Sequence, residues 1–217
     1  MKKISYILLL TLISINILSA QKWNDRKENN RKNLQENNRW ILGFGVNGLN
    51  NSGDVTKNLT KADNWTFAKI PFYLSAEVIL DEQFSLASIL SLNYFTEGKI
   101  FESETIFGKE EGGNDAGYLA FDMNVKYSFS KLLDSNAFEP YLFTGVGVSH
   151  FGDYYTQENP AELIEDISIF TFNAGFGMNY WFSSTWGVNL NATGKWGVAA
   201  TSTNHLQSSI GVLYHIK

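Results

Sequence analysis

Two neighbouring stretches of the chain alternate between apolar residues and small or polar ones. From Phe170 to Phe182 every second residue is apolar, and most residues between them are Thr, Asn or Gly. After a short polar connection the alternation restarts and runs from Trp186 to Trp196. Successive side chains of a strand point to opposite faces of the sheet. A period of two therefore predicts two long antiparallel strands joined by a tight turn.

The same alternation recurs six more times, so the chain is predicted to be all-β. The further strands are expected at residues 40–47, 72–80, 84–94, 119–129, 138–150 and 206–216. Long polar connections (48–69, 96–117, 151–166) alternate with short ones (81–83, 183–185) and a moderate one (130–137), and a medium loop spans 199–204. An even strand number, with short turns at one end and long loops at the other, is typical of outer-membrane barrels. We predict an eight-stranded antiparallel up-and-down transmembrane β-barrel with both ends of the barrel chain on the periplasmic, short-turn side.

The polar face of these strands indicates which side faces lipid. It is rich in Gly, Asn and Ser, whereas a solvated face would carry mainly Lys, Glu, Gln and Thr. The interior of an eight-stranded barrel is just wide enough for side chains to fill, which favours such small residues inside. Aromatic residues gather at the short-turn ends of the strands, as an interfacial girdle requires. They are Phe84, Tyr127, Phe129, Tyr180, Phe182, Trp186 and Tyr214.

Four ionisable side chains fall on the predicted interior face, with His215 near the periplasmic mouth. They are Glu77, Asp122, Lys126 and Lys195. Buried charges are costly unless they are paired and hydrogen-bonded. We therefore predict a charge network that joins these carboxylates to these ammonium groups across strands. The network favours a lumen that side chains fill and plug, and a gated conduction path is the alternative.

The first 20 residues have the pattern of a secretory signal peptide. Two lysines follow the initial methionine, Ile4–Leu18 is apolar, and small residues precede Gln21, where cleavage is expected. An uncleaved anchor helix is the alternative. Residues 21–39 are rich in Asn, Lys, Arg and Glu and are predicted to form a flexible periplasmic segment, with a short amphipathic helix as the alternative. The barrel is expected at residues 40–217.

Composition narrows the class of protein further. The chain of 217 residues contains no cysteine, which excludes disulfides, thiolate metal sites and a thioether lipid anchor. Its formal charge is −5, although residues 21–39 are basic, so the predicted barrel is more acidic than the whole chain. That balance argues against a nucleic-acid partner. No later segment approaches the roughly 18 consecutive apolar residues of a transmembrane helix.

Several predicted strands resemble the OmpA-like outer-membrane β-barrel domain, particularly as found in Bacteroidetes. The similar stretches are Gly43–Asn47, Ala120–Tyr127, Phe138–Tyr141, Asn173–Trp181 and the terminal strand. The resemblance covers residues 40–217 and implies a bacterial outer-membrane protein. Larger relatives continue into a peptidoglycan-binding domain, whereas this sequence stops at the eighth predicted strand, so peptidoglycan binding is not carried over.

The terminal strand is also similar to the C-terminal signal read by the barrel-assembly machinery. The signal is polar, x, Gly, x, x, aromatic, x, hydrophobic, and its positions here are Ser209, Gly211, Tyr214 and Ile216. Lys217 follows, where many barrels end on an aromatic residue. The resemblance implies that this machinery is a partner during biogenesis.

Candidate chemistry is sparse. Other eight-stranded barrels act on lipid A, so a lipid A-modifying enzyme is an alternative that needs a nucleophile, a base and an orienting group. Of the histidines, His150 and His205 are expected near the loops, but the adjacent Ser149 and His150 would point to opposite faces of one strand. Acidic segments at 51–54 and 110–115 carry oxygen ligands for Ca²⁺ without the spacing of a known loop, which favours solvated loops. We expect no enzyme activity, cofactor or metal site.

The sequence thus predicts a structural or surface-exposed outer-membrane protein with long acidic extracellular loops. Its expected partners are outer-membrane lipid and lipopolysaccharide, and it is expected to be a monomer. A narrow, porin-like small-solute channel is the main alternative.

Overall fold

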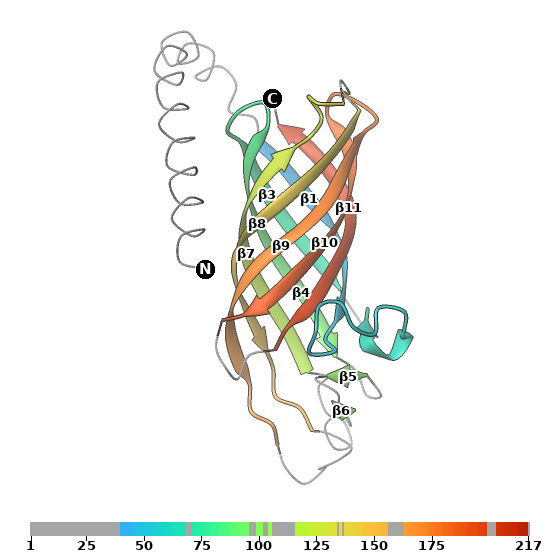
Figure 1. The fold of residues 1–217 in the computed structure, drawn as a ribbon, viewed down its shortest axis with the longest axis vertical. Helices are drawn as coiled ribbons and strands as arrows, with labels where there is room; N and C mark the ends of the chain where they lie inside the picture. The colour runs from blue at the N-terminus through green and yellow to red at the C-terminus, as the bar shows by residue number, and fades with distance from the viewer. Residues whose placement is uncertain are drawn as a thin grey trace, which may run out of the picture. The chain divides into compact units, whose positions relative to one another are not determined.

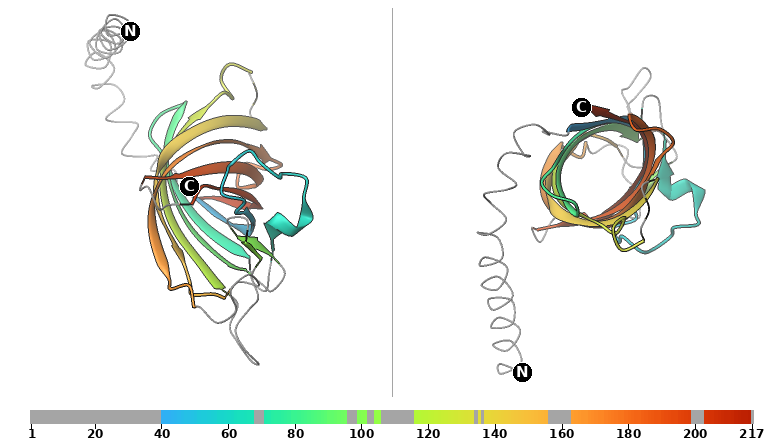
Figure 2. Two further views of the ribbon diagram at one scale, coloured as in Figure 1. Left: turned by 60° about the horizontal axis from the view of Figure 1, so that its bottom comes forward. Right: turned by 90° about the horizontal axis from the view of Figure 1, so that it is seen from above.

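The computed structural model describes residues 40–67, 71–95, 99–101, 104–105, 116–133, 135, 137–155, 163–198 and 203–216. Within these ranges, eight long antiparallel strands form one closed barrel, which Figure 2 shows end-on as a ring. Each strand pairs with its neighbours in the chain, and the first pairs with the last. They are β1 (Trp40–Asn50), β3 (Phe72–Ile79), β4 (Phe84–Phe95), β7 (Ala116–Ser128), β8 (Phe138–Phe151), β9 (Ile167–Trp181), β10 (Trp186–Gly197) and β11 (His205–Ile216).

Closure depends on the pairing of β1 with β11, in which Trp40 lies opposite Ile216 and Asn50 opposite Leu206. This ladder leaves no open edge between the first and last strands, and lipid cannot satisfy the backbone groups of such an edge. The start of β1 and the end of β11 lie with the short turns, at the top of Figure 1. The predicted eight-stranded up-and-down barrel is confirmed.

Several strands extend further toward the long loops than the sequence predicts. β7 begins at Ala116 instead of residue 119, β9 begins at Ile167 instead of 170, and β1 continues to Asn50. Glycines and polar residues interrupt the apolar alternation there, but backbone pairing with neighbouring strands continues. Short elements inside the predicted loops were also missed. They are η1 (Ala62–Asn64), β2 (Trp65–Thr66), β5 (Ile100–Phe101) and β6 (Glu104–Thr105).

The faces of the strands are arranged as the alternation predicts. Along β7, residues from Ala116 to Lys126 are exposed or partly exposed at one position and buried at the next. Phe176 is 64% exposed and Leu190 is 48% exposed, although both are large and apolar. Exposed apolar side chains of this size cover all eight strands. Such an exterior suits lipid and would be unfavourable in water.

An aromatic girdle surrounds the short-turn end of the barrel. Trp186 packs edge-on against Tyr214 with ring centroids 4.9 Å apart, and Phe84 packs in the same way against Tyr127 at 5.1 Å. Phe182 continues the ring beside the β9–β10 turn and is mostly exposed. Aromatic side chains favour the boundary between hydrocarbon and water, so this ring marks the edge of the apolar band at the short-turn end.

The predicted signal peptide (1–20), the predicted flexible segment (21–39) and Lys217 lie outside the described residues. Among the described residues, no helix is long and apolar enough to cross a membrane.

Glycines permit a close approach at the seam where the barrel closes. Gly45 lies opposite Gly211 in the β1–β11 ladder, and a Cβ atom at Gly45 would collide with the carbonyl oxygen of Ile210. We expect Gly45→Ala to lower the free energy of unfolding by about 1–3 kcal/mol, because backbone cannot move aside without disturbing the ladder. Urea titration of the folded band on a heat-modifiability gel measures the change.

Gly117→Ala in β7 is the matched control, since a Cβ atom there would have no neighbour within 4 Å. It should change the free energy by about 0.5 kcal/mol or less. Equal effects of the two substitutions would contradict the close-approach explanation.

Candidate functional site

The interior of the barrel holds the ionisable side chains singled out in the sequence. Near the short-turn end, Lys126 Nζ of β7 donates to Glu77 Oε2 of β3 at 2.5 Å. Ser85 of β4 donates to the other oxygen of the same carboxylate at 2.5 Å. The ammonium group also lies 4.0 Å from the centre of the Tyr141 ring, which adds a cation–π contact. Four neighbouring strands therefore converge on one ion pair.

Amide and hydroxyl side chains continue from this pair across the lumen. Asn189 Nδ2 donates to the Tyr141 hydroxyl and to Asn179 Oδ1, each at 2.7 Å. Asn191 donates to Asn189, and Ser209 donates to Asn191. The side chains thus satisfy one another across β8, β9, β10 and β11, as buried polar groups require.

A second ion pair lies closer to the long loops. Lys195 Nζ of β10 donates to Asp122 Oδ2 of β7 at 2.7 Å, and neither side chain is more than 3% exposed. Asn173 Nδ2 donates to the other carboxylate oxygen at 2.8 Å. The ammonium group also donates to the Tyr118 hydroxyl at 3.1 Å. Both charges are therefore paired and hydrogen-bonded.

The four predicted residues come together as two separate pairs instead of one network. Asp122 and Lys126 lie on the same face of β7, but four residues apart, which is about 13 Å along a strand. Asp122 pairs with β10 on one side, whereas Lys126 pairs with β3 on the other. The distance along the strand explains why the carboxylate and ammonium of β7 do not pair with each other.

The sequence reasoning missed His205 as part of the interior. It was expected near the loops, but its side chain is 1% exposed and lies inside the barrel. Its Nε2 lies 3.0 Å from the Tyr118 hydroxyl, and its ring packs edge-on against Tyr118 and Phe151. His205 has the same parity as the inward-facing Gln207 and Ser209. Starting the last predicted strand at residue 205 would therefore have placed its side chain inside the barrel.

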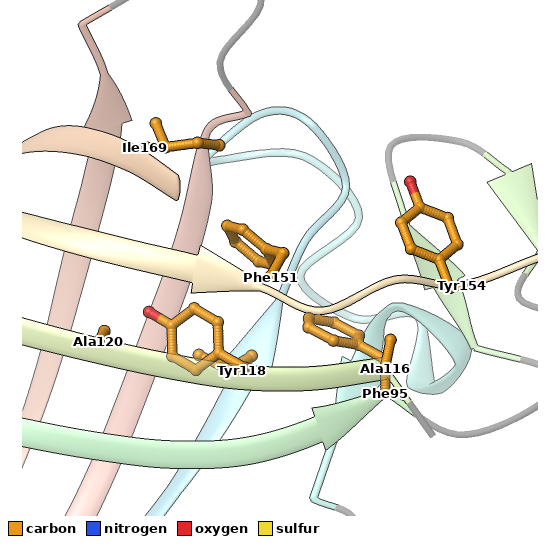
Figure 3. Packing of buried hydrophobic residues seen from close by; sticks show 8 residues of the cluster. Phe95, Ala116, Tyr118, Ala120, Phe151, Tyr154 and Ile169 are labelled. Atoms are coloured by element: carbon orange, nitrogen blue, oxygen red, sulfur yellow. The ribbon is translucent and has the colours of Figure 1, made fainter. Parts of the chain in front are cut away.

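An apolar cluster fills the long-loop end of the lumen, on the loop side of the second ion pair (Figure 3). Phe151 packs against Tyr118 with ring centroids 5.1 Å apart and against Phe95 at 6.1 Å. The other buried members are Leu49, Ala116, Ala120, Tyr154 and Ile169. This cluster, called the cap below, brings together side chains from β1, β4, β7, β8 and β9 with Tyr154 of the following loop.

Little free space remains beside the first ion pair. A cavity of about 30 Å³ is lined by Glu77, Lys126, Tyr141 and Asn124, among others. That volume has room for about one or two water molecules. At this level the side chains of the described residues fill most of the lumen.

The histidines do not assemble a catalytic relay. His150 faces outward, where its Nδ1 lies 3.0 Å from Ser168 Oγ and 4.0 Å from Asp166 Oδ2. Ser149 faces inward and lies 3.3 Å from the Tyr118 hydroxyl, so it is separated from His150 as predicted. In a serine triad the nucleophile and the acidic residue contact opposite ring nitrogens, whereas here both approach Nδ1.

The residues of the predicted assembly signal occupy different environments. Ser209 points inward, Gly211 lies in the closing seam, and Tyr214 packs on Trp186 in the girdle. Ile216 is paired with Trp40 at the end of the barrel. Recognition by the assembly machinery stays a prediction. The remaining histidine, His215, lies at the short-turn end with its ring centroid 5.7 Å from that of Trp181.

The first acidic loop segment is organised by its own hydrogen bonds. Asp54 accepts from the backbone N–H and the hydroxyl of Thr56, both at 2.9 Å, and pairs with Lys57 at 3.2 Å. These contacts, the backbone hydrogen bond above all, lower the pKa of Asp54 to about 2. The second segment, 110–115, lies outside the described residues. Among the residues that are described, no cluster of three or more acidic or histidine ligands could hold a metal ion.

Comparison with known proteins identifies the fold. No family model and no curated protein sequence matches the chain. Among solved structures, it is similar to the outer membrane protein OprG from Pseudomonas aeruginosa (TM-score 0.53, 12% identity, 82% of this chain and 96% of that one). The N-terminal β-barrel domain of Pseudomonas aeruginosa OprF gives a TM-score of 0.51 at 11% identity, covering 82% and 98%. The chain has the fold of an outer-membrane β-barrel.

A third similar structure is Neisserial surface protein A, with a TM-score of 0.50 at 8% identity over 83% of this chain and 97% of that one. At such identities the likeness establishes the fold alone. Together with the exposed apolar band and the girdle, it identifies the chain as a bacterial outer-membrane barrel protein. The narrower resemblance to Bacteroidetes barrels is not addressed by these neighbours.

Removal of one partner from the deeper ion pair tests its role in this outer-membrane barrel. We expect Lys195→Met to lower the free energy of unfolding by about 3–5 kcal/mol, because the Asp122 carboxylate would stay buried without a countercharge. Adding Asp122→Asn should restore much of the loss. Urea titration in detergent micelles measures both variants.

Lys131→Met is the matched control, because Lys131 pairs with Glu82 at the short-turn end, where both side chains are more than half exposed. An exposed pair contributes about 1 kcal/mol or less. A loss at Lys195 no larger than that at Lys131 would show that the interior pair is solvated.

Proposed function

We propose that this chain is an outer-membrane protein whose barrel is a closed anchor for its extracellular loops. The barrel holds the loops at the cell surface, where they contribute structure or contact ligands outside the cell. The observation that carries the proposal is the filled lumen, in which two ion pairs and an apolar cap lie at successive levels.

The arrangement of the cap supports a surface role for the loops over a transport role for the lumen. Phe151 and Tyr154 belong to β8 and the loop that follows it, and both are buried in the cap. The carbonyl and N–H of Tyr154 pair with Ile164 across the same loop. The loop is thereby fastened to the barrel at its base, which suits a segment that presents a surface.

A narrow channel is a weaker candidate. Conduction would require a path past Lys195 and Asp122 and then past Lys126 and Glu77, and each of these pairs is held by at least one further side chain. Separating a buried pair leaves two buried charges without their countercharges, which costs several kcal/mol.

Lipid A modification is also a weaker candidate, and we propose that the chain is not an enzyme. Ser168, His150 and Asp166 lie together on the outer wall, but a hydrolase needs separate contacts for the nucleophile and for the orienting acid. The shared nitrogen Nδ1 supports the non-enzymatic proposal.

The finer assignment to an OmpA-like, Bacteroidetes-type barrel rests on the sequence stretches and is part of this proposal. Its proposed partners are lipopolysaccharide and, during biogenesis, the barrel-assembly machinery. The chain is proposed to be a monomer. The acidic excess of the chain argues against nucleic acid as a partner.

Planar-bilayer recording tests the closed lumen. We expect the native chain to give no large, steady conductance, because side chains fill the lumen at the level of Glu77 and Lys126. The triple variant Glu77→Ala, Lys126→Ala, Tyr141→Ala empties only this level without leaving an unpaired charge, and it should stay without conductance because the Lys195–Asp122 pair and the apolar cap still fill the rest of the lumen. A native barrel with a large, steady conductance would refute the closed-anchor proposal.

Cysteine labelling tests the orientation of the loops. The chain has no native cysteine, so a single introduced thiol reports one position. We expect Thr60→Cys, in the exposed loop after β1, to react with a membrane-impermeant maleimide on intact cells. Ser184→Cys, in the exposed β9–β10 turn, should react only after the outer membrane is opened. The reverse pattern would contradict the proposed orientation.

A further inference from the structure

The loop after β1 lies against the outside of the barrel. In Figures 1 and 2 the segment that contains η1 and β2 lies outside the ring of strands, at the long-loop end. β2 pairs with the end of β1, placing Trp65 opposite Asn50 and Thr66 opposite Leu49. The loop therefore covers part of the outer wall, which elsewhere faces lipid.

A glycine on the lipid-facing side of β1 admits this contact. Gly48 has the same outward parity as Phe44 and Val46, and a Cβ atom there would collide with the ring of Phe67. Its partner across the seam is Ser208, another small outward-facing residue. The two strands thus have small residues, Gly48 and Ser208, at this position, and the large side chain of Phe67 from the loop packs over Gly48.

The aromatic side chains of the loop form a small platform. The rings of Trp65 and Phe67 are stacked with centroids 6.0 Å apart and planes within 9° of each other. Trp65 Nε1 donates to the Leu59 carbonyl at 2.8 Å, which fixes the indole, while Phe67 remains 62% exposed. Exposed aromatic rings at this end of a barrel suit the outer interface of the membrane.

A cation lies at the edge of the platform. An open pocket of about 470 Å³ is lined by Ala62, Trp65, Phe67, Lys99 and Ser208. Lys99 Nζ donates to the Ala62 carbonyl at 3.2 Å, and an ammonium group has three donors, so it retains capacity for another acceptor. We call these five residues the loop ledge.

Charge distinguishes the loop ledge from other hollows of the outer wall. Two further grooves, of about 720 and 420 Å³, are lined by described residues of which none is charged. Near the loop ledge, the exposed Lys61 and Asp63 flank Ala62 with opposite charges. Among the five residues that line the loop ledge, Lys99 carries the charge.

We propose that the loop ledge binds a lipid of the outer leaflet whose headgroup carries phosphate, as lipid A does. The acyl chain lies along Phe67 and the small residues of the β1–β11 seam, and Lys99 donates to a phosphate oxygen. Ammonium groups form strong, charge-assisted hydrogen bonds with phosphate, and the aromatic platform places the headgroup at interfacial depth. This inference rests on the outer-membrane location in the proposed function and names one lipid partner for it.

Native mass spectrometry of the full chain in detergent micelles tests the site. The probes are bis-phosphorylated lipid A, fully dephosphorylated lipid A and inorganic phosphate alone. We expect the native chain to prefer the phosphorylated lipid by about tenfold, the size of one charge-assisted hydrogen bond. Lys99→Gln should abolish this preference, and the double variant Trp65→Ala, Phe67→Ala should weaken the binding of both lipids.

Two control variants separate the loop ledge from general lipid contact. Lys131→Gln removes a lysine at the periplasmic end, and Phe170→Ala removes a 72% exposed aromatic residue of β9 that lies outside the loop ledge. Both should bind as the native chain does, and all variants should keep heat-modifiable migration, which reports a folded barrel.

Three results would overturn the inference. These are equal affinity of the native chain for the two lipids, a preference that survives Lys99→Gln, and binding of inorganic phosphate as tight as that of the phosphorylated lipid. Bilayer conductance is a separate readout. A barrel that conducts but keeps the lipid preference refutes only the closed anchor, and a silent barrel without the preference refutes only the loop ledge.

Discussion

A polar group inside a narrow barrel in lipid can be satisfied only by other groups inside the same barrel and by the few water molecules for which the lumen has room. The wall uses its backbone groups in the ladders, and the surrounding hydrocarbon offers neither donors nor acceptors. Lys195 and Asp122 show the consequence, since their charges are paired and further bonded to Tyr118 and Asn173. The eight-stranded ring makes this pairing possible, because it brings β7 and β10 within reach across the lumen.

This constraint also organises the barrel along its length. Toward the short turns the lumen is polar, and toward the long loops it ends in the apolar cap around Phe151. Between the cap and the first loop, Asn93 Nδ2 donates to Asn47 Oδ1 at 2.8 Å, and Asn47 Nδ2 donates to the carbonyls of Phe72 and Leu92. These bonds tie β1, β3 and β4 together beneath the loop that carries the aromatic platform.

The exterior obeys a looser rule, which explains how the fold is shared at 8–12% identity with OprG, OprF and Neisserial surface protein A. A lipid-facing position needs only an apolar side chain, so many residues are acceptable there. An inward-facing position must match its neighbours in size and hydrogen bonding, and each barrel can solve that problem differently. Barrels that share this fold therefore need not share a function, and the function of this chain depends on its own lumen and loops.

The sequence by itself determined the wall of the barrel. A period of two is a local property, so Phe172, Phe176 and Val212 could be placed on the lipid side without knowledge of any partner strand. The inward placement of Glu77, Asp122, Lys126 and Lys195 followed from the same parity. Strand ends were less accurate, because the alternation fades where glycines and polar residues continue a strand into its loop.

Only the tertiary structure decided which groups meet. Pairing of Lys126 with Glu77, and of Lys195 with Asp122, depends on the register and closure of the ring, which no local pattern contains. The same holds for His205 beneath Phe151 and for Phe67 on Gly48, where residues distant in the chain become neighbours. Parity assigns a side chain to a face, whereas contact across the lumen or across the seam requires the closed ring.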